Sequence, residues 1–339
     1  MYNLNFFGEM IRMDGISIKA TSKINLGLDI IGKRDDGYHI IDMVLQELDW
    51  SDEVVIRKYM FSAEDDALFP DSNRLLKKSR YFVQGNIVLK TIPAEADEYY
   101  TLQDGAFDGL DDDERNLAYE AARLMCDTYD IKEKISIEIR KKNPMGAGMG
   151  GGSADAAAVI KGINELFELG ATEAELEAIG IKLGADVPFC IRGGCARVGG
   201  IGEKMETIPS FNNVHVLIVK PDFGLNTGKM YQLCDEIENP IHPDIDSIVS
   251  GCRDNDLEKL CANLANMMEQ PKTESQAVIL DIKERLKQAG AKGALLTGSG
   301  SAVFGLFDDE SAVREAYDTM LGFAQDNNMT MFITRFKGE

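Results

Sequence analysis

The sequence predicts an α+β protein of two domains, and three observations support this fold class. A strand-like segment leads through a glycine-rich loop into an amphipathic helix at residues 135–167, and helices alternate with a few strands beyond residue 213. Between these regions, residues 208–213 are rich in turn formers, which favours a domain boundary there. The chain has 339 residues, 44% of them hydrophobic and 27% charged, so it is long enough for two folded domains. We expect these domains at residues 14–209 and 210–339.

The N-terminal region is predicted to form a series of short strands. Ile16–Ala20 alternates apolar and polar residues, and Lys23–Ile31 follows as a second strand-like piece. Gly32–His39 has the composition of a turn, after which Ile40–Trp50 and Glu53–Lys58 indicate two more strands.

One face of the second strand is polar, and Lys23 and Asn25 both lie on it. By itself this pattern favours a solvated strand end at Lys23.

Residues 60–114 carry clusters of acidic side chains, interrupted by one apolar piece, Asn86–Ile92, that is typical of an edge strand. A run of like charge is usually a solvated face, so no function is assigned to it. Regular structure is predicted again at Arg115–Tyr129, where apolar residues recur at helical spacing.

The most informative segment is Pro144–Val159, which reads P-M-G-A-G-M-G-G-G-S-A-D-A-A-A-V. Glycine has no Cβ, so consecutive glycines let main-chain N–H groups converge on an anion. The strand Ile135–Arg140 precedes the loop, and helical spacing of apolar residues begins at Ser153, so the loop ends at the positive end of a helix dipole. The expected phosphate-binding residues are Pro144, Gly146, Gly148, Gly150, Gly151, Gly152 and Ser153.

The alternative interpretation of this segment is a flexible glycine linker. The loop lacks the G-K-[ST] ending of a P-loop, and it is not a plain G-x-G-x-x-G after a strand. A linker, however, should be polar and unstructured on both sides, whereas this loop joins a patterned strand to a patterned helix. The flanking patterns therefore favour a phosphate loop.

Thr172–Glu175 has the form of a capping box, which predicts a helix running to Leu183. Ala185–Pro188 follows, and Phe189–Val198 is β-like. An isolated aspartate beside a glycine, such as Asp186, is most often a turn or cap residue.

The C-terminal region alternates strands and helices around a second glycine turn, Thr297–Ser301. Taken alone, such a sequence is most often only a turn. Helices are predicted from Thr227, across residues 242–289 and at Ser311–Phe323, and the strands are Val214–Val219, Gly293–Leu296, Ala302–Phe307 and Thr330–Arg335.

Composition excludes several functional classes. The net charge of −21 argues against nucleic-acid and anionic-membrane partners, which are held mainly by clustered Lys and Arg. The six cysteines form no C-x-x-C and the three histidines are far apart, so we expect no structural zinc site. The same cysteine pattern favours a reduced, cytoplasmic protein. No apolar run approaches membrane-spanning length. The N-terminus is a poor signal peptide, and Met13 is a plausible alternative start.

Several motifs, taken together and in order, resemble the GHMP kinase superfamily of galactokinase, homoserine kinase, mevalonate kinase and phosphomevalonate kinase. The resemblance covers most of the chain from Ile16 to Phe307. K-I-N-L beside D-G-Y-H points to the branch that phosphorylates 4-diphosphocytidyl-2-C-methyl-D-erythritol in the non-mevalonate isoprenoid pathway. The motifs are Lys23–Leu26, Asp36–His39, Asn116–Tyr119, the glycine loop, Gly184–Pro188, Gly202–Glu203 and Leu296–Gly300.

The resemblance implies an N-terminal domain like ribosomal protein S5 domain 2, a ferredoxin-like C-terminal domain, and an active site between them. It implies a small-molecule substrate and the cofactors ATP and Mg²⁺. The Mg²⁺ ion would be carried by ATP, and Ser153 is its candidate protein ligand. Asp186 matches the general base, Lys23 its neighbouring cation, and Asn25 a residue that lines the site. The residues matched to the cytosine pocket are Tyr38, His39 and Tyr231.

Three features depart from the family pattern: the long segment 60–114, Glu120 where a lysine is common, and Ala154 in place of a frequent second serine. Two other functions stay open at this point. Another small-alcohol kinase of the superfamily would keep the glycine loop and Asp186 without needing the cytosine pocket. A catalytically silent nucleotide-binding protein would tolerate loss of Asp186 and Lys23, although both are present.

Overall fold

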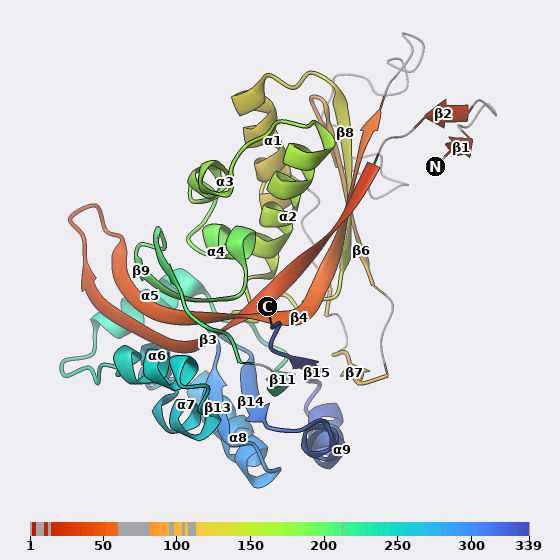
Figure 1. Cartoon of the computed structure of the whole chain (residues 1–339). Coiled ribbons are helices and arrows are strands. Elements are labelled where there is room, and N and C mark those ends of the chain that lie inside the picture. The colour runs from red at the N-terminus through yellow and green to blue at the C-terminus, as the bar shows by residue number, and fades with distance from the viewer. Residues whose placement is uncertain are drawn as a thin grey trace.

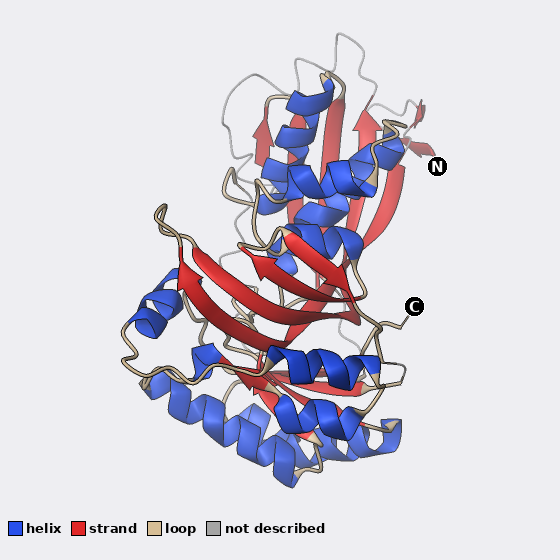
Figure 2. Ribbon diagram, turned by 60° about the vertical axis from the view of Figure 1, so that its left-hand side comes forward, coloured by secondary structure: helices blue, strands red, loops and turns tan. Residues whose placement is uncertain are grey.

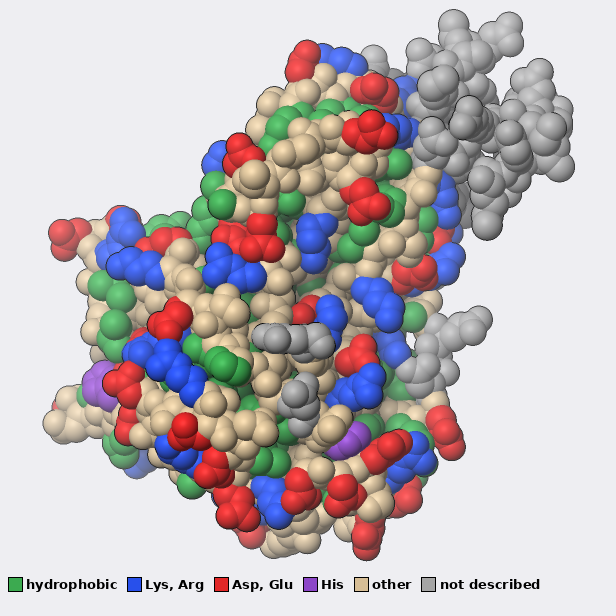
Figure 3. Space-filling model, in the orientation of Figure 1, with side chains coloured by type: hydrophobic (Ala, Val, Ile, Leu, Met, Phe, Trp, Pro, Cys, Tyr) green, Lys and Arg blue, Asp and Glu red, His purple; other side chains and the backbone are tan. Residues whose placement is uncertain are grey.

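The computed structural model describes residues 2–4, 10–12, 15–59, 82–94, 98–103, 106–107, 113–211 and 213–338. Met13 and most of the acidic segment 60–114 lie outside these residues. The described chain forms two large sheets with helices packed on them, and a small sheet of β1 (Tyr2–Leu4) and β2 (Met10–Arg12) (Figure 1). On the face shown in Figure 3, acidic side chains are interspersed with Lys and Arg.

The first sheet is built around two long antiparallel strands, β3 (Gly15–Lys33) and β4 (His39–Tyr59). Its main path runs β10-β9-β4-β8-β6-β5, and β3 pairs with β4. The other strands are β5 (Phe82–Gln84), β6 (Ile87–Pro93), β8 (Lys134–Lys141), β9 (Cys195–Gly200) and β10 (Lys204–Thr207).

The prediction of four short N-terminal strands was wrong in detail, because each pair is one continuous strand. The register between β3 and β4 shifts at three places, between Thr21 and Lys23, Asn25 and Gly27, and Ile30 and Gly32. Such irregularities bend a strand without ending it, and they blur the period-two pattern read from sequence. The two strands consequently curve from one half of the molecule into the other (Figures 1 and 2).

Two further predictions need correction. The edge strand expected at Asn86–Ile92 is β6, which lies between β8 and β5. The β-like segment predicted from Phe189 to Val198 begins as a helix, α4 (Val187–Arg192), and only then becomes β9. Pro188 in the first turn of α4 is a helix-start signal that outweighs the apolar run.

Helices α1 (Leu117–Tyr129), α2 (Gly151–Leu166), α3 (Glu173–Gly180) and α4 cover one face of the first sheet (Figure 1). The capping box predicted at Thr172 is present and begins α3, which ends at Gly180, three residues before the expected Leu183. Helix α2 contributes more buried residues than any of the other three. Its alanines and isoleucines pack against β3 and β4.

The second sheet has the order β13-β14-β11-β15-β7. Its strands are β7 (Tyr100–Thr101), β11 (His215–Lys220), β13 (Gly293–Leu296), β14 (Val303–Phe307) and β15 (Thr330–Arg335). Helices α8 (Glu274–Gln288) and α9 (Glu310–Asp326) cover one face of this sheet. The remaining elements of the C-terminal half are α5 (Thr227–Asp235), α6 (Ile245–Arg253), α7 (Leu257–Asn263), β12 (Ala265–Asn266) and the 3₁₀ turn η2 (Met267–Glu269).

Alternate residues of β11 belong to different cores, as expected for a strand buried on both faces. Leu217 packs with α8 and α9, whereas Val216 and Ile218 pack in the same core as Ile24 and Leu48 of the first sheet. The two sheets therefore share a core, and the loops that line the cleft described below are held against it. The predicted boundary at residues 209 and 210 falls in the connection from β10 to β11 and stays a prediction.

Among the described residues, no helix is both long enough and apolar enough to cross a membrane.

Candidate active site

The glycine loop runs from the end of β8 to the start of α2 and takes conformations that favour glycine. Gly146, Gly148 and Gly150 have φ angles of 61°, 75° and 70°, which L side chains rarely adopt. A Cβ on Gly148 would lie 2.1 Å from the carbonyl oxygen of Thr297. The loop is therefore in close contact with the second glycine turn, and it is an ordered element rather than a linker.

Helix α2 begins without a side-chain cap. Its N-cap residue, Gly150, is left-handed and offers no side-chain acceptor to the first N–H groups of the helix. These N–H groups, together with the helix dipole, make the start of α2 suited to a bound phosphate. Ser153, in the first turn, adds a hydroxyl at the same place.

Lys23 occupies the centre of the arrangement. Its ammonium donates to Asn25 Oδ1 at 2.7 Å and to the carbonyl oxygen of Gly148 at 3.0 Å, and it lies 3.4 Å from Asp186 Oδ2. The Lys23 side chain is only 4% exposed. A solvated strand end is therefore the wrong interpretation of this lysine, and the polar face of β3 is a buried one.

Asp186 is the N-cap residue of α4 by position, yet its carboxylate makes no capping hydrogen bond. The side chain is 29% exposed and faces the cleft beside Lys23 and Gly150. A carboxylate that is partly exposed and paired with only one ammonium keeps free lone pairs. Asp186 can therefore accept a proton from a group in the cleft.

The second glycine turn, Thr297–Ser301, is packed against the first. The Thr297 hydroxyl accepts the N–H of Asn25 at 3.1 Å and lies 3.2 Å from the carbonyl oxygen of Gly148, to which it can donate. The N–H groups of Ser301 and Ala302 donate to carbonyl oxygens of the glycine loop. The segment Thr297–Ser301 is therefore a packing partner of the glycine loop and not only the turn expected from its sequence.

Thr297→Val is expected to destabilise the fold by about 1–3 kcal/mol, because it leaves the buried N–H of Asn25 without its acceptor. Urea unfolding measures this change. Thr297→Ser, which keeps the hydroxyl, should retain most of the stability, and equal stability of the valine variant and the natural protein would contradict the role of this hydrogen bond.

A cleft of about 370 Å³ contains Lys23, Asn25, Asp186, Ser153 and Tyr231. Gly146, Gly148 and Gly150 of the glycine loop also line it, as do Gly298, Ser299 and Gly300 of the second glycine turn. A second cleft of about 360 Å³ is lined by all of Pro144–Ser153 and by Asn116. The glycine loop thus borders two clefts, one that holds the Lys23–Asp186 pair and one that Lys141 and Asp155 help to line.

The three residues expected to hold cytosine are arranged differently from one another. Tyr231 lines the cleft, and burial raises its pKa to about 12. The ring of His39 stacks on Tyr231, with centroids 4.4 Å apart, and His39 Nε2 lies 2.8 Å from Asp235 Oδ1. Tyr38 is 62% exposed at the tip of the β3–β4 hairpin and does not contribute to the cleft wall.

Sequence reasoning did not single out Thr227 and Ser299, whose hydroxyl oxygens lie 2.8 Å apart on the wall of the cleft. The signal was weak, since a threonine at the start of a helix and a serine between glycines are common in caps and turns.

Comparison with known proteins decides the family. Models of the GHMP kinases N terminal domain and the GHMP kinases C terminal domain match residues 116–194 and 246–324. A 4-diphosphocytidyl-2-C-methyl-D-erythritol kinase from Clostridium beijerinckii is 37% identical over 320 residues, which cover 94% of this chain and 99% of that protein. One from Acetivibrio thermocellus is 40% identical over 306 residues, covering 90% and 95%. This chain belongs to the 4-diphosphocytidyl-2-C-methyl-D-erythritol kinase family.

A crystal structure of a 4-(cytidine 5'-diphospho)-2C-methyl-D-erythritol kinase matches the fold with a TM-score of 0.68 at 23% identity, over 95% of this chain and all of the other. The expected two-domain GHMP kinase fold is confirmed. Within this kinase, the N-terminal match contains the glycine loop and Asp186, and the C-terminal match contains the Thr297 turn. Lys23 and Tyr231 lie outside both matched ranges, so the cleft is completed by segments beyond them.

Proposed function

We propose that this kinase transfers the γ-phosphoryl group of ATP to a hydroxyl of 4-diphosphocytidyl-2-C-methyl-D-erythritol, a step of non-mevalonate isoprenoid precursor biosynthesis. The observation that carries the proposal is the Lys23–Asp186 pair, 3.4 Å apart, beside the uncapped start of α2 in one cleft. The names of the relatives support the choice of substrate. The six cysteines, all free thiols, support a cytoplasmic enzyme.

Asp186 is the proposed general base. An alcohol has a pKa far above neutral, so its proton must be accepted as the phosphoryl group arrives, and a carboxylate with free lone pairs can accept it. Lys23 keeps Asp186 oriented and offsets negative charge on the phosphoryl oxygens. Asn25 and the Gly148 carbonyl hold the ammonium in place.

The glycine loop and the start of α2 are the proposed phosphate site, where main-chain N–H groups replace the water around the phosphate oxygens. The Ser153 hydroxyl on this cleft fits an oxygen ligand of a magnesium ion brought in with ATP. When bound, such an ion would offset the charge of the phosphates. Among the described residues no cluster of three or more His, Cys, Asp or Glu side chains fits a protein-held metal.

In the proposed cytosine pocket, the His39 ring covers one face of Tyr231. Stacked rings 4.4 Å apart leave no room for a base between them. A base held by Tyr38 and Tyr231 would therefore stack on the other face of Tyr231 or displace the His39 ring. His39 Nε2 already lies 2.8 Å from Asp235 Oδ1, so Nδ1 is the ring nitrogen that His39 offers to the polar edge of cytosine.

Tyr231→Ala is expected to raise the KM for the cytidine-containing substrate about 5–150-fold, which corresponds to the loss of about 1–3 kcal/mol of base stacking. Tyr38→Ala should act in the same direction. Steady-state kinetics with each substrate varied in turn measures the change, and the KM for ATP serves as the internal control. The uridine analogue should be a poor substrate of the natural enzyme, and its equal turnover would remove the case for a cytosine pocket.

The test of the function itself is a coupled assay of ADP release. The cytidine-containing substrate should be turned over, whereas mevalonate, homoserine and galactose should not. Turnover of one of the other alcohols would assign the chain to a different small-alcohol kinase. ATP binding without turnover of any of them would favour a silent nucleotide-binding protein.

A further inference from the structure

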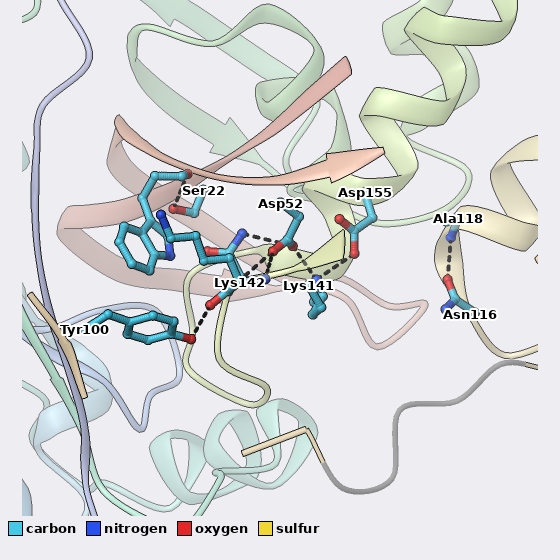
Figure 4. A network of polar contacts seen from close by, with 10 residues as sticks. Ser22, Asp52, Tyr100, Asn116, Ala118, Lys141, Lys142 and Asp155 are labelled. Atoms are coloured by element: carbon cyan, nitrogen blue, oxygen red, sulfur yellow. Dashed lines mark hydrogen bonds and ion pairs between the residues drawn. The ribbon is translucent and has the colours of Figure 1, made fainter. Parts of the chain in front are cut away.

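Beneath the glycine loop lies a buried group of charged side chains that takes no part in the mechanism above. Asp52 on β4, Lys141 at the end of β8 and Asp155 on α2 are 1%, 7% and 4% exposed. The Lys141 ammonium donates to Asp52 Oδ2 and to Asp155 Oδ2, both at 2.6 Å (Figure 4). Charges are rarely buried this fully unless they are paired, and each buried pair carries a desolvation cost.

Asp52 also binds the main chain where the glycine loop begins. Its Oδ1 accepts the N–H groups of Lys142 and Asn143 at 2.5 and 2.7 Å, and its Oδ2 accepts the Asn143 side-chain amide at 3.0 Å. With the Lys141 ammonium, this one carboxylate accepts four hydrogen bonds. Figure 4 shows Asp52 between Lys141 and this stretch of main chain.

The other end of the loop is fixed through Lys141. Asp155 lies in the second turn of α2, beyond the last glycine, and it is joined to Asp52 by the shared ammonium. A Cβ built on Gly151 would lie 3.3 Å from Lys141 Nζ, so the ammonium is directly under the first residue of α2. The two ends of a loop that contains three left-handed glycines are therefore fastened to one point.

We infer that Asp52 is a positioning residue for nucleotide binding, because with Lys141 and Asp155 it holds both ends of the glycine loop in the conformation that receives phosphate. The inference rests on the proposed function, since it concerns the same phosphate site. A loop that is already ordered avoids the entropy cost of ordering it when the ligand binds, and N–H groups bind an anion well only when they are aimed in advance. Asp52 makes no contact with the cleft that holds Lys23 and Asp186.

The ionisation of the group fits this role. Burial would lower the pKa of Lys141, but the charges of Asp155 and Asp52 raise it above its usual value, so the ammonium stays charged. Burial, together with the charge of Asp52, raises the pKa of Asp155 well above its usual value despite the opposing effect of Lys141. The raised pKa favours the neutral form of Asp155, and an asparagine at 155 keeps an uncharged side chain with an oxygen acceptor for Lys141.

The test measures the dissociation constants of AMP-PNP with magnesium and of the cytidine-containing substrate by calorimetry on the full-length protein. Asp52→Ala should weaken AMP-PNP binding at least tenfold and change binding of the cytidine-containing substrate less than twofold. The matched control is Glu53→Gln, which removes an exposed ion pair with Arg140 between the same two strands and should leave both constants within twofold. A folded Asp52→Ala protein with natural AMP-PNP affinity, or an equal loss for both ligands, overturns the inference.

If Asp52→Ala fails to fold, Asp155 provides the same test from the other end of the loop. Asp155→Ala should weaken AMP-PNP binding at least fivefold, and the conservative variant Asp155→Asn should recover it to within twofold of the natural protein. If the alanine and asparagine variants bind AMP-PNP with equal affinity, the inference is overturned and the proposed function is not affected. Failure of the natural protein to bind AMP-PNP would overturn the proposed function together with the inference.

Discussion

Asp186→Asn is expected to lower kcat by about 10²–10⁴-fold while leaving ATP binding within a few fold. Asparagine keeps the size of the side chain and one oxygen near Lys23, but it cannot accept the proton of the substrate hydroxyl. Steady-state kinetics with both substrates, and direct measurement of ATP binding, separate the loss of a base from the loss of a binding contact.

The matched control for this change is Asp130→Asn, at an aspartate whose side chain is 85% exposed on the surface after α1. Asparagine tolerates the left-handed backbone found at that position, so activity should be unchanged. A fall of less than about tenfold in kcat for Asp186→Asn would mean that positioning dominates the rate and that the base assignment is wrong.

Gly150→Val is expected to abolish measurable ATP binding. The backbone there has a φ of 70°, and even a Cβ would lie 3.1 Å from Lys23 Cε and 3.7 Å from Asp186 Oδ2. Branched valine adds two methyl groups in this space, so it displaces Lys23 and blocks approach of a phosphate to the start of α2. Nucleotide binding by calorimetry is the measurement, with circular dichroism to verify the fold.

Gly170→Val controls for the cost of the backbone conformation. Gly170 has a φ of 69°, and a Cβ added there meets no atom within 4 Å. The two variants therefore carry a similar backbone strain in different surroundings. If both lose ATP binding to the same extent, strain and not the phosphate site explains the effect of Gly150→Val.

The centre of the fold could be predicted from the sequence because local signals agree there. The strand β8, the glycine loop and α2 each have a clear period or composition, and the structure begins α2 at Gly151, two residues before the expected start. The strands Gly293–Leu296 and Thr330–Arg335 were predicted with the bounds that the structure has. In these segments local propensity and tertiary packing favour the same structure.

Other parts were less predictable because tertiary contacts override the local pattern. From Ala20 to Ile30, β3 is buried on both faces, so polar residues such as Lys23 lie inside and the alternation that marks a strand is lost. The start of α4 was missed because an apolar run of that length fits either a strand or a buried helix.

Sequence motifs made some residues of the candidate site predictable. Residues that come together only through burial in the fold could not be predicted. Lys23 and Asp186 were found through resemblance, and the structure brings them together. Asp52, Lys141 and Asp155 are separated by up to 103 positions in sequence, and each alone has the features of a surface charge. Only the packing of β4, β8 and α2 makes them one group.

Two short strands cross between the halves of the molecule. β7 comes from the N-terminal half yet extends the second sheet beside β15, and β12 comes from the C-terminal half yet pairs with β3 of the first sheet. Each half therefore holds a piece of the other, and the halves cannot swing apart as two lobes on a hinge without breaking main-chain hydrogen bonds. Breaking the pairing of β12 with β3 or of β7 with β15 is therefore part of the free-energy cost of any hinge opening of the cleft.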